Sequence, residues 1–155
     1  MKDNNSDDLF DWIYSKILLF ISYKERTEFE VIRKLRILFG RQYIIDSRKA
    51  EIQNKILDNL YNLKLLDDRK YSKMYIKEKI EGEKPVSKPK IISFLIKKGV
   101  PRNIIEDYIE LYDFDVEFEF VKKEISRGRA TKYLLQKGYS LDVIKGVVDT
   151  LEDVK

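Results

Sequence analysis

The segments "KIISFLIKKGVPRNIIEDYIE" (residues 90–110) and "RATKYLLQKGYSLDVIKGVVD" (residues 129–149) decide the fold of this 155-residue chain. They align without gaps at an offset of 39 residues, and each combines two stretches of helical spacing with a Lys-Gly pair between them. Self-similarity at such a spacing is typical of tandem helical repeats. The identical pairs are Leu95/Leu134, Lys98/Lys137, Gly99/Gly138 and Ile105/Ile144.

The Lys-Gly pair predicts how the first helix of each copy ends. Glycine adopts the left-handed backbone conformation that terminates a helix without steric cost, and a lysine before it suits the negative end of the helix dipole. Pro101 in one copy and Ser140 in the other are typical of the start of the next helix. We therefore expect a helix, a tight turn and a second helix in each copy.

Helical periodicity extends over most of the chain. It is clearest over residues 140–151, and a looser first copy of the repeat lies in residues 27–63, where "GRQYIIDSRK" replaces the Lys-Gly turn. We predict an all-α protein of three tandem three-helix repeats that form an elongated, curved helical array. The expected parts are a flexible tail at residues 1–8 and repeats at residues 9–66, 67–112 and 113–155, the first helix running from about Leu9 to Ile21.

One segment does not fit this pattern. "YDFDVEFEFV" (residues 112–121) alternates apolar and acidic residues, which is typical of a half-buried strand. A single strand would lack a partner, because no second segment of the chain alternates as well. We therefore predict a helix that begins near Asp113–Asp115.

Polar residues at three places in the chain are predicted to start helices. Thr27 and Glu30 in "TEFE" match a capping box, and Ser140 is a natural N-cap. Asp67 and Asp68 could be read as a metal or acid pair. Adjacent residues at a helix start rarely point to one site, and no further acidic ligand lies close in the sequence, so we interpret them as caps of the helix that follows.

The composition excludes several classes of activity. The chain has no cysteine and no histidine, so disulfides, Cys or His zinc sites, Ser-His triads and histidine bases are excluded. We expect a protein that is not an enzyme, with no catalytic residues, no metal site and no cofactor. "MKDNNSDD" lacks an apolar core, and the aliphatic stretch at residues 17–21 is too short to cross a bilayer, so we expect a cytoplasmic protein.

The net charge of +4 is unevenly distributed. Residues 82–102 contain six Lys/Arg and one acid, and residues 120–146 contain seven Lys/Arg and two acids. These blocks suggest a polyanionic or acidic partner, although a solvated lysine surface would give the same pattern. "SRGRATK" (residues 126–132) also resembles a loop and helix start that binds phosphate. The candidate partner- or DNA-binding residues are Lys88, Lys90, Lys97, Lys98, Arg102, Lys122, Lys123, Arg127, Arg129, Lys132 and Lys137.

The aromatic residues are mostly predicted to be core residues. Tyr71, Tyr75, Tyr108 and Tyr133 occupy apolar-face positions. Trp12 is expected to anchor the first helix, and the alternative for it is an exposed contact with a partner. A platform on which bases stack would need exposed aromatic rings among basic residues. Tyr43 and Tyr139 are the two candidates for that role.

Four stretches together resemble the RecX family, the bacterial regulators of the RecA recombinase. They are "ISYKERTEFEVIRKL" (residues 21–35), "LKLLDDRKYSKMYI" (residues 63–76), "FLIKKGV" (residues 94–100) and "YLLQKGYSLDVI" (residues 133–144). The second resembles the most recognisable motif of the family, a leucine pair followed by Asp-Asp or Asn-Asp and an aromatic residue. The resemblance covers residues 17–151 and departs from the family pattern at "GRQYIID", at Ser72 and at "EGEKPVSKPK".

This resemblance implies a non-enzymatic, monomeric modulator that lies in the groove of the RecA filament on single-stranded DNA. Such a protein would restrain the recombinase, ATPase and coprotease activities of RecA in DNA repair, recombination and the SOS response. Its basic face would meet an acidic surface of RecA or the phosphate backbone of single- or double-stranded DNA. The alternative is a helical-repeat protein that binds DNA independently of RecA.

Overall fold

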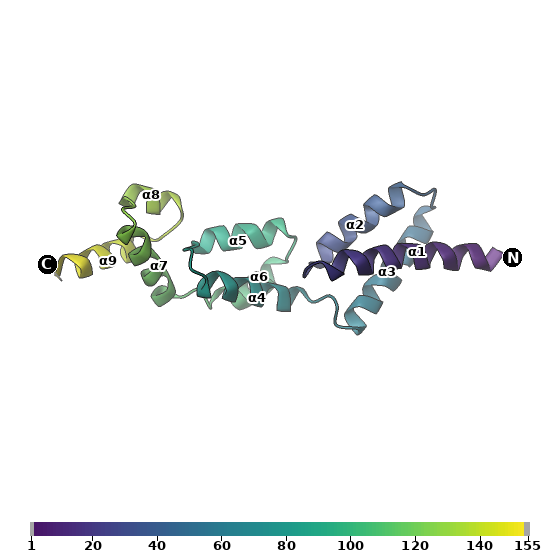
Figure 1. The fold of residues 1–155 in the computed structure, drawn as a ribbon, viewed down its shortest axis with the longest axis horizontal. Coiled ribbons are helices and arrows are strands. Elements are labelled where there is room, and N and C mark those ends of the chain that lie inside the picture. The colour runs from purple at the N-terminus through teal and green to yellow at the C-terminus, as the bar shows by residue number, and fades with distance from the viewer. Residues whose placement is uncertain (1, 154–155) are drawn as a thin grey trace. The chain divides into compact units, whose positions relative to one another are not determined.

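The computed structural model describes the backbone of residues 2–153 and the side chains of residues 8–153. Over these residues the protein is all-α, with nine helices and no strand (Figure 1). The helices are α1 (Lys2–Ser22), α2 (Glu28–Gly40), α3 (Asp46–Asn62), α4 (Asp68–Glu81), α5 (Lys88–Lys97), α6 (Arg102–Ile109), α7 (Phe114–Ser126), α8 (Thr131–Gln136) and α9 (Leu141–Asp153).

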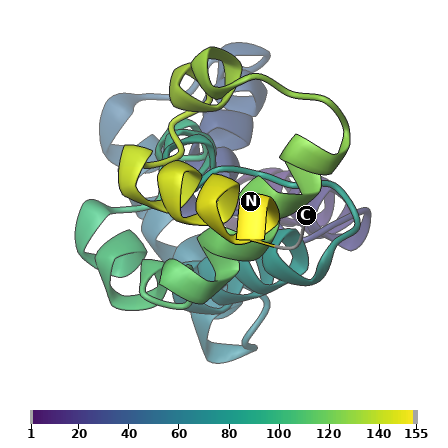
Figure 2. The ribbon, with the colours of Figure 1, turned by 90° about the vertical axis from the view of Figure 1, so that its left-hand side faces the viewer.

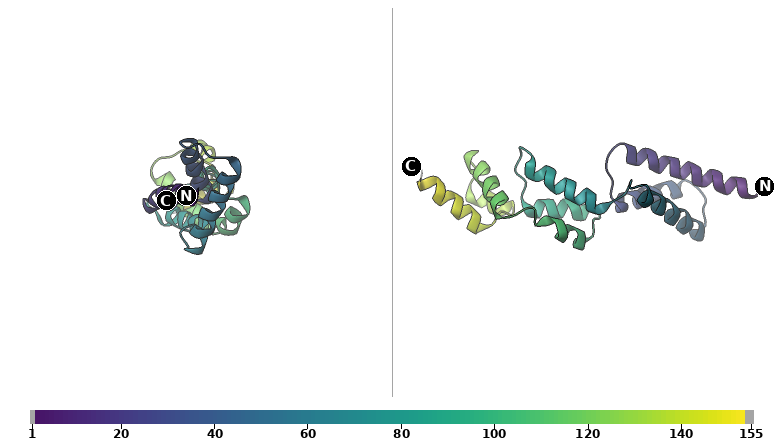
Figure 3. Two further views of the ribbon diagram at one scale, coloured as in Figure 1. Left: turned by 90° about the vertical axis from the view of Figure 1, so that its right-hand side faces the viewer. Right: turned by 90° about the horizontal axis from the view of Figure 1, so that it is seen from below.

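The chain forms two compact units. The first contains the chain up to Tyr71 together with Lys98–Val100, and the second contains Ser72–Lys97 and the chain from Pro101 onward. In the first unit α2 contacts both α1 and α3, and the three helices are seen from below in the right panel of Figure 3. In the second unit α9 contacts α7 and α8, and Figure 2 shows these three helices at the front.

The core of the first unit is built by apolar residues that recur at helical spacing. Each of its helices presents one apolar stripe, and the stripes meet at side chains with almost no exposed surface. Trp12 is half-buried against this cluster, as expected for a residue that anchors α1. The fully buried members are Ile13, Ile17, Val31, Leu35, Leu38, Ile52, Ile56, Leu60 and Leu66.

The second unit buries a similar set of side chains. The stacked rings of Tyr75 and Phe94, with centroids 4.2 Å apart, join α4 to α5. Tyr71, Tyr75, Tyr108 and Tyr133 are all partly buried rather than fully buried. The buried apolar residues of this unit are Ile76, Ile91, Leu95, Ile105, Ile109, Tyr112, Phe120, Val121, Leu134, Tyr139, Val143, Ile144 and Val147.

The segment of residues 112–121 contains the start of helix α7, as predicted. The Asp113 carboxylate accepts a hydrogen bond from the Val116 amide at 3.0 Å, which caps α7. Phe120, Val121 and Glu124 form the buried stripe of α7, a helical spacing that the local alternation of apolar and acidic residues had obscured.

The predicted start of the first helix is wrong. α1 begins at Lys2, seven residues before Leu9, so most of the predicted N-terminal tail is helical. The polar stretch at its start contains neither glycine nor proline, and nothing in it interrupts a helix that the apolar residues after it stabilise.

Candidate partner-binding surface

Both Lys-Gly turns have the predicted backbone and lie against the start of another helix. Gly99 has φ +79° and Gly138 has φ +95°. A Cβ on Gly99 would meet Phe29 near the start of α2 at 2.2 Å, and one on Gly138 would meet Pro89 near the start of α5 at 2.6 Å. We call these contacts the first turn interface, within the first unit, and the second turn interface, within the second unit.

The first turn interface is closed by hydrogen bonds and charge. The buried Thr27 hydroxyl accepts a hydrogen bond from the Glu30 amide at 3.2 Å and donates one to the Lys98 carbonyl at 2.6 Å. The Glu30 carboxylate lies 3.2 Å from the Arg26 guanidinium and 4.0 Å from the Lys98 ammonium. The Thr27 half of the predicted capping box is therefore present, and the Glu30 side chain binds two cations.

Lys98 thus has a structural role. Its side chain is 28% exposed and its ammonium faces a carboxylate of the same unit. This geometry matches the alternative interpretation of the basic residues, in which a lysine at a helix end stabilises the fold rather than a complex. Lys98 is the weakest of the eleven candidates for a partner contact.

Asp67 and Asp68 cap two different helices. The Asp67 carboxylate accepts hydrogen bonds from the amides of Arg69 and Lys70 at 3.0 and 3.1 Å, which caps α4. Asp68 is buried, and its carboxylate accepts a hydrogen bond from the Glu28 amide at the start of α2 at 3.0 Å. Burial raises the pKa of Asp68, and the bond from Glu28 opposes that rise. The sequence predicted capping but not the long-range partner of Asp68.

Several basic candidates gather at a small hollow in the second unit. Its volume is about 70 Å³, and we call it the α5–α8 hollow. Lys90 and Lys137 supply its positive charge, and Arg127 and Arg129 lie next to it, 3.8 and 3.9 Å from the Glu124 carboxylate. The residues that line the hollow are Pro85, Ser87, Lys90, Glu124, Tyr133, Lys137 and Tyr139.

Two aromatic rings shape this basic region. The Arg129 guanidinium lies 4.8 Å and the Lys137 ammonium 5.5 Å from the centre of the Tyr133 ring, both within range of a cation–π contact. Tyr139 is buried, so the prediction of Tyr139 as an exposed stacking platform is wrong. Its burial raises the pKa of its hydroxyl, and the nearby Glu124 carboxylate raises it further. Tyr43, the other predicted platform, is fully exposed.

The remaining candidates lie outside the hollow. Lys97 ends α5 and Arg102 begins α6, and both side chains are exposed. Lys88 at the start of α5 is partly buried. On α7 and α8 the exposed candidates are Lys122, Lys123 and Lys132.

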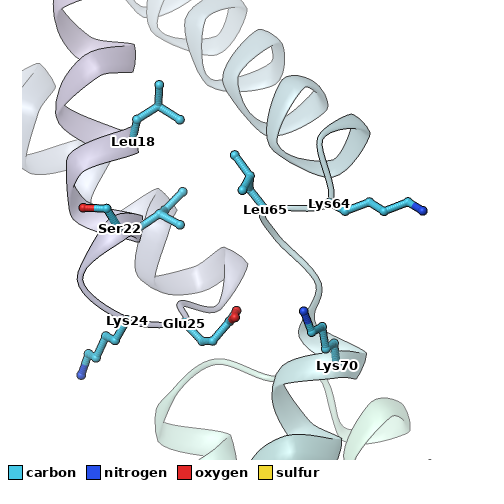
Figure 4. A pocket seen from close by; sticks show the side chains of 8 residues that line it. Leu18, Ser22, Lys24, Glu25, Lys64, Leu65 and Lys70 are labelled. Carbon is cyan, nitrogen blue, oxygen red and sulfur yellow. The ribbon is translucent and has the colours of Figure 1, made fainter.

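The first unit contains a larger hollow that sequence reasoning did not identify. Its volume is about 570 Å³, and Figure 4 shows Leu18 of α1 and Leu65 of the α3–α4 connection on its two sides, with Lys24 and Lys64 pointing away from it. Lys64 has φ +57°, a left-handed conformation that is uncommon for a residue with a side chain. The residues that line it are Leu18, Ile21, Ser22, Lys24, Glu25, Lys64, Leu65 and Lys70.

Two negative findings limit the chemistry of the described residues. No group of three or more acidic residues in residues 8–153 has the geometry of a metal site. Of the nine helices in the described part of the chain, none combines the length and the apolar character that a membrane span requires.

Comparison with known proteins gives a consistent set of relatives. No family model matches the chain. The chain is 35% identical over 148 residues to the regulatory protein RecX of Finegoldia magna, and the aligned region covers 84% of this chain and 67% of that protein. It is 27% identical over 151 residues to the regulatory protein RecX of Limosilactobacillus reuteri, and spans about half of that relative (53%).

Solved structures show the same fold. The crystal structure of RecX from Lactobacillus salivarius superposes with a TM-score of 0.72 at 26% identity, over 94% of this chain and 98% of that chain. A second crystal structure of a regulatory protein RecX gives a TM-score of 0.74 at 24% identity, over 94% of this chain and 75% of that chain.

Proposed function

Because this chain belongs to the RecX family, we propose that it is a regulatory protein of the RecA recombinase. In this proposal it binds the RecA filament, lies along its groove as an array of three-helix repeats, and lowers its recombinase, ATPase and coprotease activities. The identity of 35% to the Finegoldia magna protein is the observation that carries the proposal. A cytoplasmic location follows from the same assignment, because RecA acts on chromosomal DNA.

The basic side chains of the second unit support a contact with an acidic or phosphate-bearing surface. Lys122, Lys123 and Lys132 are exposed and make no ion pair with a carboxylate of residues 8–153. Exposed charges of one sign speed up association with a surface of the opposite sign, and their effect falls as the salt concentration rises. We propose these residues as contacts with the filament.

The test is the DNA-dependent ATP hydrolysis of RecA on single-stranded DNA. We expect substoichiometric amounts of the protein to lower the rate, and the double variant Lys122→Glu/Lys132→Glu to require about tenfold more protein for half-inhibition. The matched control is Lys73→Glu/Lys77→Glu, which reverses two exposed lysines of α4. An ATPase rate that does not change over a wide range of protein concentration would contradict the proposal.

The second candidate is a DNA-binding protein that acts without RecA. The observation that favours it is the group of basic residues at the α7–α8 loop, where Arg127 and Arg129 flank a glycine with nothing within 4 Å of its Cβ position. Tight binding to DNA alone, with an affinity that falls steeply with salt, would support it. The buried residues of α6 and α9 count against it, because these helices use Ile105, Ile109 and Val147 to pack inside the unit.

A further inference from the structure

The two turn interfaces have the same backbone plan but different polar groups. Thr27 and Ser87 precede the helices α2 and α5, and their carbonyls accept hydrogen bonds from the amides of Val31 and Ile91, both at 3.1 Å. The same offset of 60 residues relates Glu30 to Lys90. The second residue of each helix, Phe29 in α2 and Pro89 in α5, lies against a Lys-Gly turn, at Gly99 and at Gly138.

The hydroxyl groups at the two positions differ in their partners. The Thr27 hydroxyl makes two hydrogen bonds. Ser87 is only 2% exposed, and its hydroxyl has no hydrogen-bond partner among the described residues. A buried hydroxyl without a protein partner is satisfied by an ordered water or by a ligand, so the Ser87 hydroxyl is available to one. Ser87 is one of the residues that line the α5–α8 hollow.

The two interfaces also differ in charge, because among the described residues only the first contains an ion pair across the turn. The Glu30 carboxylate lies 4.0 Å from the Lys98 ammonium, whereas Lys90 stands at the position that corresponds to Glu30. Within the described part of the chain neither Lys90 nor Lys137 forms an ion pair with a carboxylate. Glu124 is the one carboxylate in the lining of the hollow, and its ion pairs are with Arg127 and Arg129. The second interface therefore has no carboxylate at the position of Glu30, and the carboxylate that it does contain is paired with two arginines.

We propose that the α5–α8 hollow binds a phosphate group in the place that the Glu30 carboxylate takes at the first turn interface. The Ser87 hydroxyl, the Lys90 ammonium and the Lys137 ammonium are its donors. The Lys90 amide at the start of α5 adds to them, because Ser87 does not cap it and an N-terminal helix end attracts anions.

The size of the hollow selects the ligand. At about 70 Å³ it is far smaller than the roughly 300 Å³ or more of an ordinary organic ligand pocket, so one small anion fits and a nucleoside does not. The phosphate is either the free anion or a phosphodiester of a nucleic-acid backbone. The inference requires no contact with RecA, so its failure and that of the proposed function are separate outcomes.

The test is an amide-detected NMR titration of the full chain with inorganic phosphate, with chloride used to hold the ionic strength constant. We expect saturating shifts at Ser87, Lys90, Lys137 and Gly138. Lys90→Gln should raise the apparent Kd for phosphate about tenfold, because it removes one charged hydrogen-bond donor. Lys97→Gln removes the same charge from the other end of α5 and should change the Kd less than about twofold. Equal effects of the two variants, or shifts that do not saturate, would overturn the inference.

A second variant tests the inference and is expected to fold as stably as the wild type. Lys90→Glu places a carboxylate next to Lys137, as Glu30 is placed next to Lys98 at the first interface. We expect this variant to lose the phosphate-dependent shifts and to keep or raise its Tm. Phosphate binding by Lys90→Glu as tight as that of the wild type would overturn the assignment of the site.

The source of the phosphate is distinguished by a short oligothymidylate in place of inorganic phosphate. If the oligonucleotide shifts the same amides and inorganic phosphate displaces it, the ligand is a backbone phosphodiester. If only inorganic phosphate shifts them, the ligand is the free anion. If neither probe shifts the amides of Ser87 and Lys90, the hollow is not a phosphate site.

Discussion

The first and second turn interfaces place the same glycine turn against the same part of a helix, but they are stabilised differently. At the first, Thr27, Glu30 and Lys98 supply two hydrogen bonds and a pair of opposite charges. At the second, Ser87, Lys90 and Lys137 supply a hydroxyl without a described partner and two like charges. The backbone contact is thus common to both interfaces, whereas the polar groups differ. At the first interface they stabilise the turn, and at the second they form the proposed phosphate site.

The largest effect is expected when the backbone contact itself is blocked. Gly99→Ala forces a residue with a Cβ into a left-handed conformation, and that Cβ would lie 2.2 Å from Phe29. We expect the free energy of unfolding to fall by about 3 kcal/mol. Gly138→Ala, with its nearest approach at 2.6 Å to Pro89, should cost about 2 kcal/mol. Urea denaturation of the full chain measures both values.

Gly128→Ala separates the cost of the left-handed backbone from the cost of a steric clash of the new Cβ. Gly128 has φ +81°, close to that of Gly99, but nothing lies within 4 Å of its Cβ position. This variant should lose only the conformational preference, about 1 kcal/mol. If all three alanine variants lose the same free energy, the turns do not depend on close contact with Phe29 and Pro89.

The glycine turns were the part of the fold that the sequence predicted best. Two gapless copies of a Lys-Gly pair between apolar stripes have one economical interpretation, and the left-handed conformations of Gly99 and Gly138 confirm it. The helix at residues 112–121 was predicted because a lone strand has no partner, and α7 confirms that argument. The start of α1 was missed because polar residues without glycine or proline do not show where a helix begins.

The partners of polar side chains could not be predicted from the sequence. Asp67 and Asp68 are neighbours of the same type, yet one caps α4 and the other binds the Glu28 amide, 40 positions away. Lys98 and Lys137 are identical in the alignment, yet of the two only Lys98 forms an ion pair with a glutamate among the described residues. Such differences depend on which residue the other helix supplies, and periodicity within one helix does not contain that information.

A middle-sized effect is expected at the hydroxyl groups of the two interfaces. Thr27→Val keeps the shape of the side chain but leaves the Glu30 amide and the Lys98 carbonyl without their partner, so we expect a loss of about 2 kcal/mol in the free energy of unfolding. Ser87→Ala removes a hydroxyl that has no described partner and should change stability by less than about 0.5 kcal/mol. Thermal unfolding in buffer free of phosphate provides the comparison. Equal losses in the two variants would show that Ser87 makes the same bonds as Thr27 in solution.

The smallest effect concerns the carboxylate that joins the start of α4 to the start of α2. Burial raises the pKa of Asp68 above 3.8, so the folded state binds this proton more tightly than the unfolded state does. The contribution of Asp68 to stability is therefore present below pH 3.8 and is lost as the pH rises through the raised pKa of the folded state. Asp68→Asn keeps an oxygen that can accept the hydrogen bond from the Glu28 amide but does not titrate.

We expect Asp68→Asn to gain stability relative to the wild type as the pH rises from 3.8 toward neutrality. Urea denaturation at a series of pH values measures the difference between the two proteins. Asp67→Asn is the matched control, because it removes the same charge from the exposed neighbour. A pH-dependent gain that both variants share would arise from net charge and not from the burial of Asp68. A gain in Asp68→Asn alone would show that Asp68 stabilises the fold through its hydrogen bond to α2 and not through its negative charge.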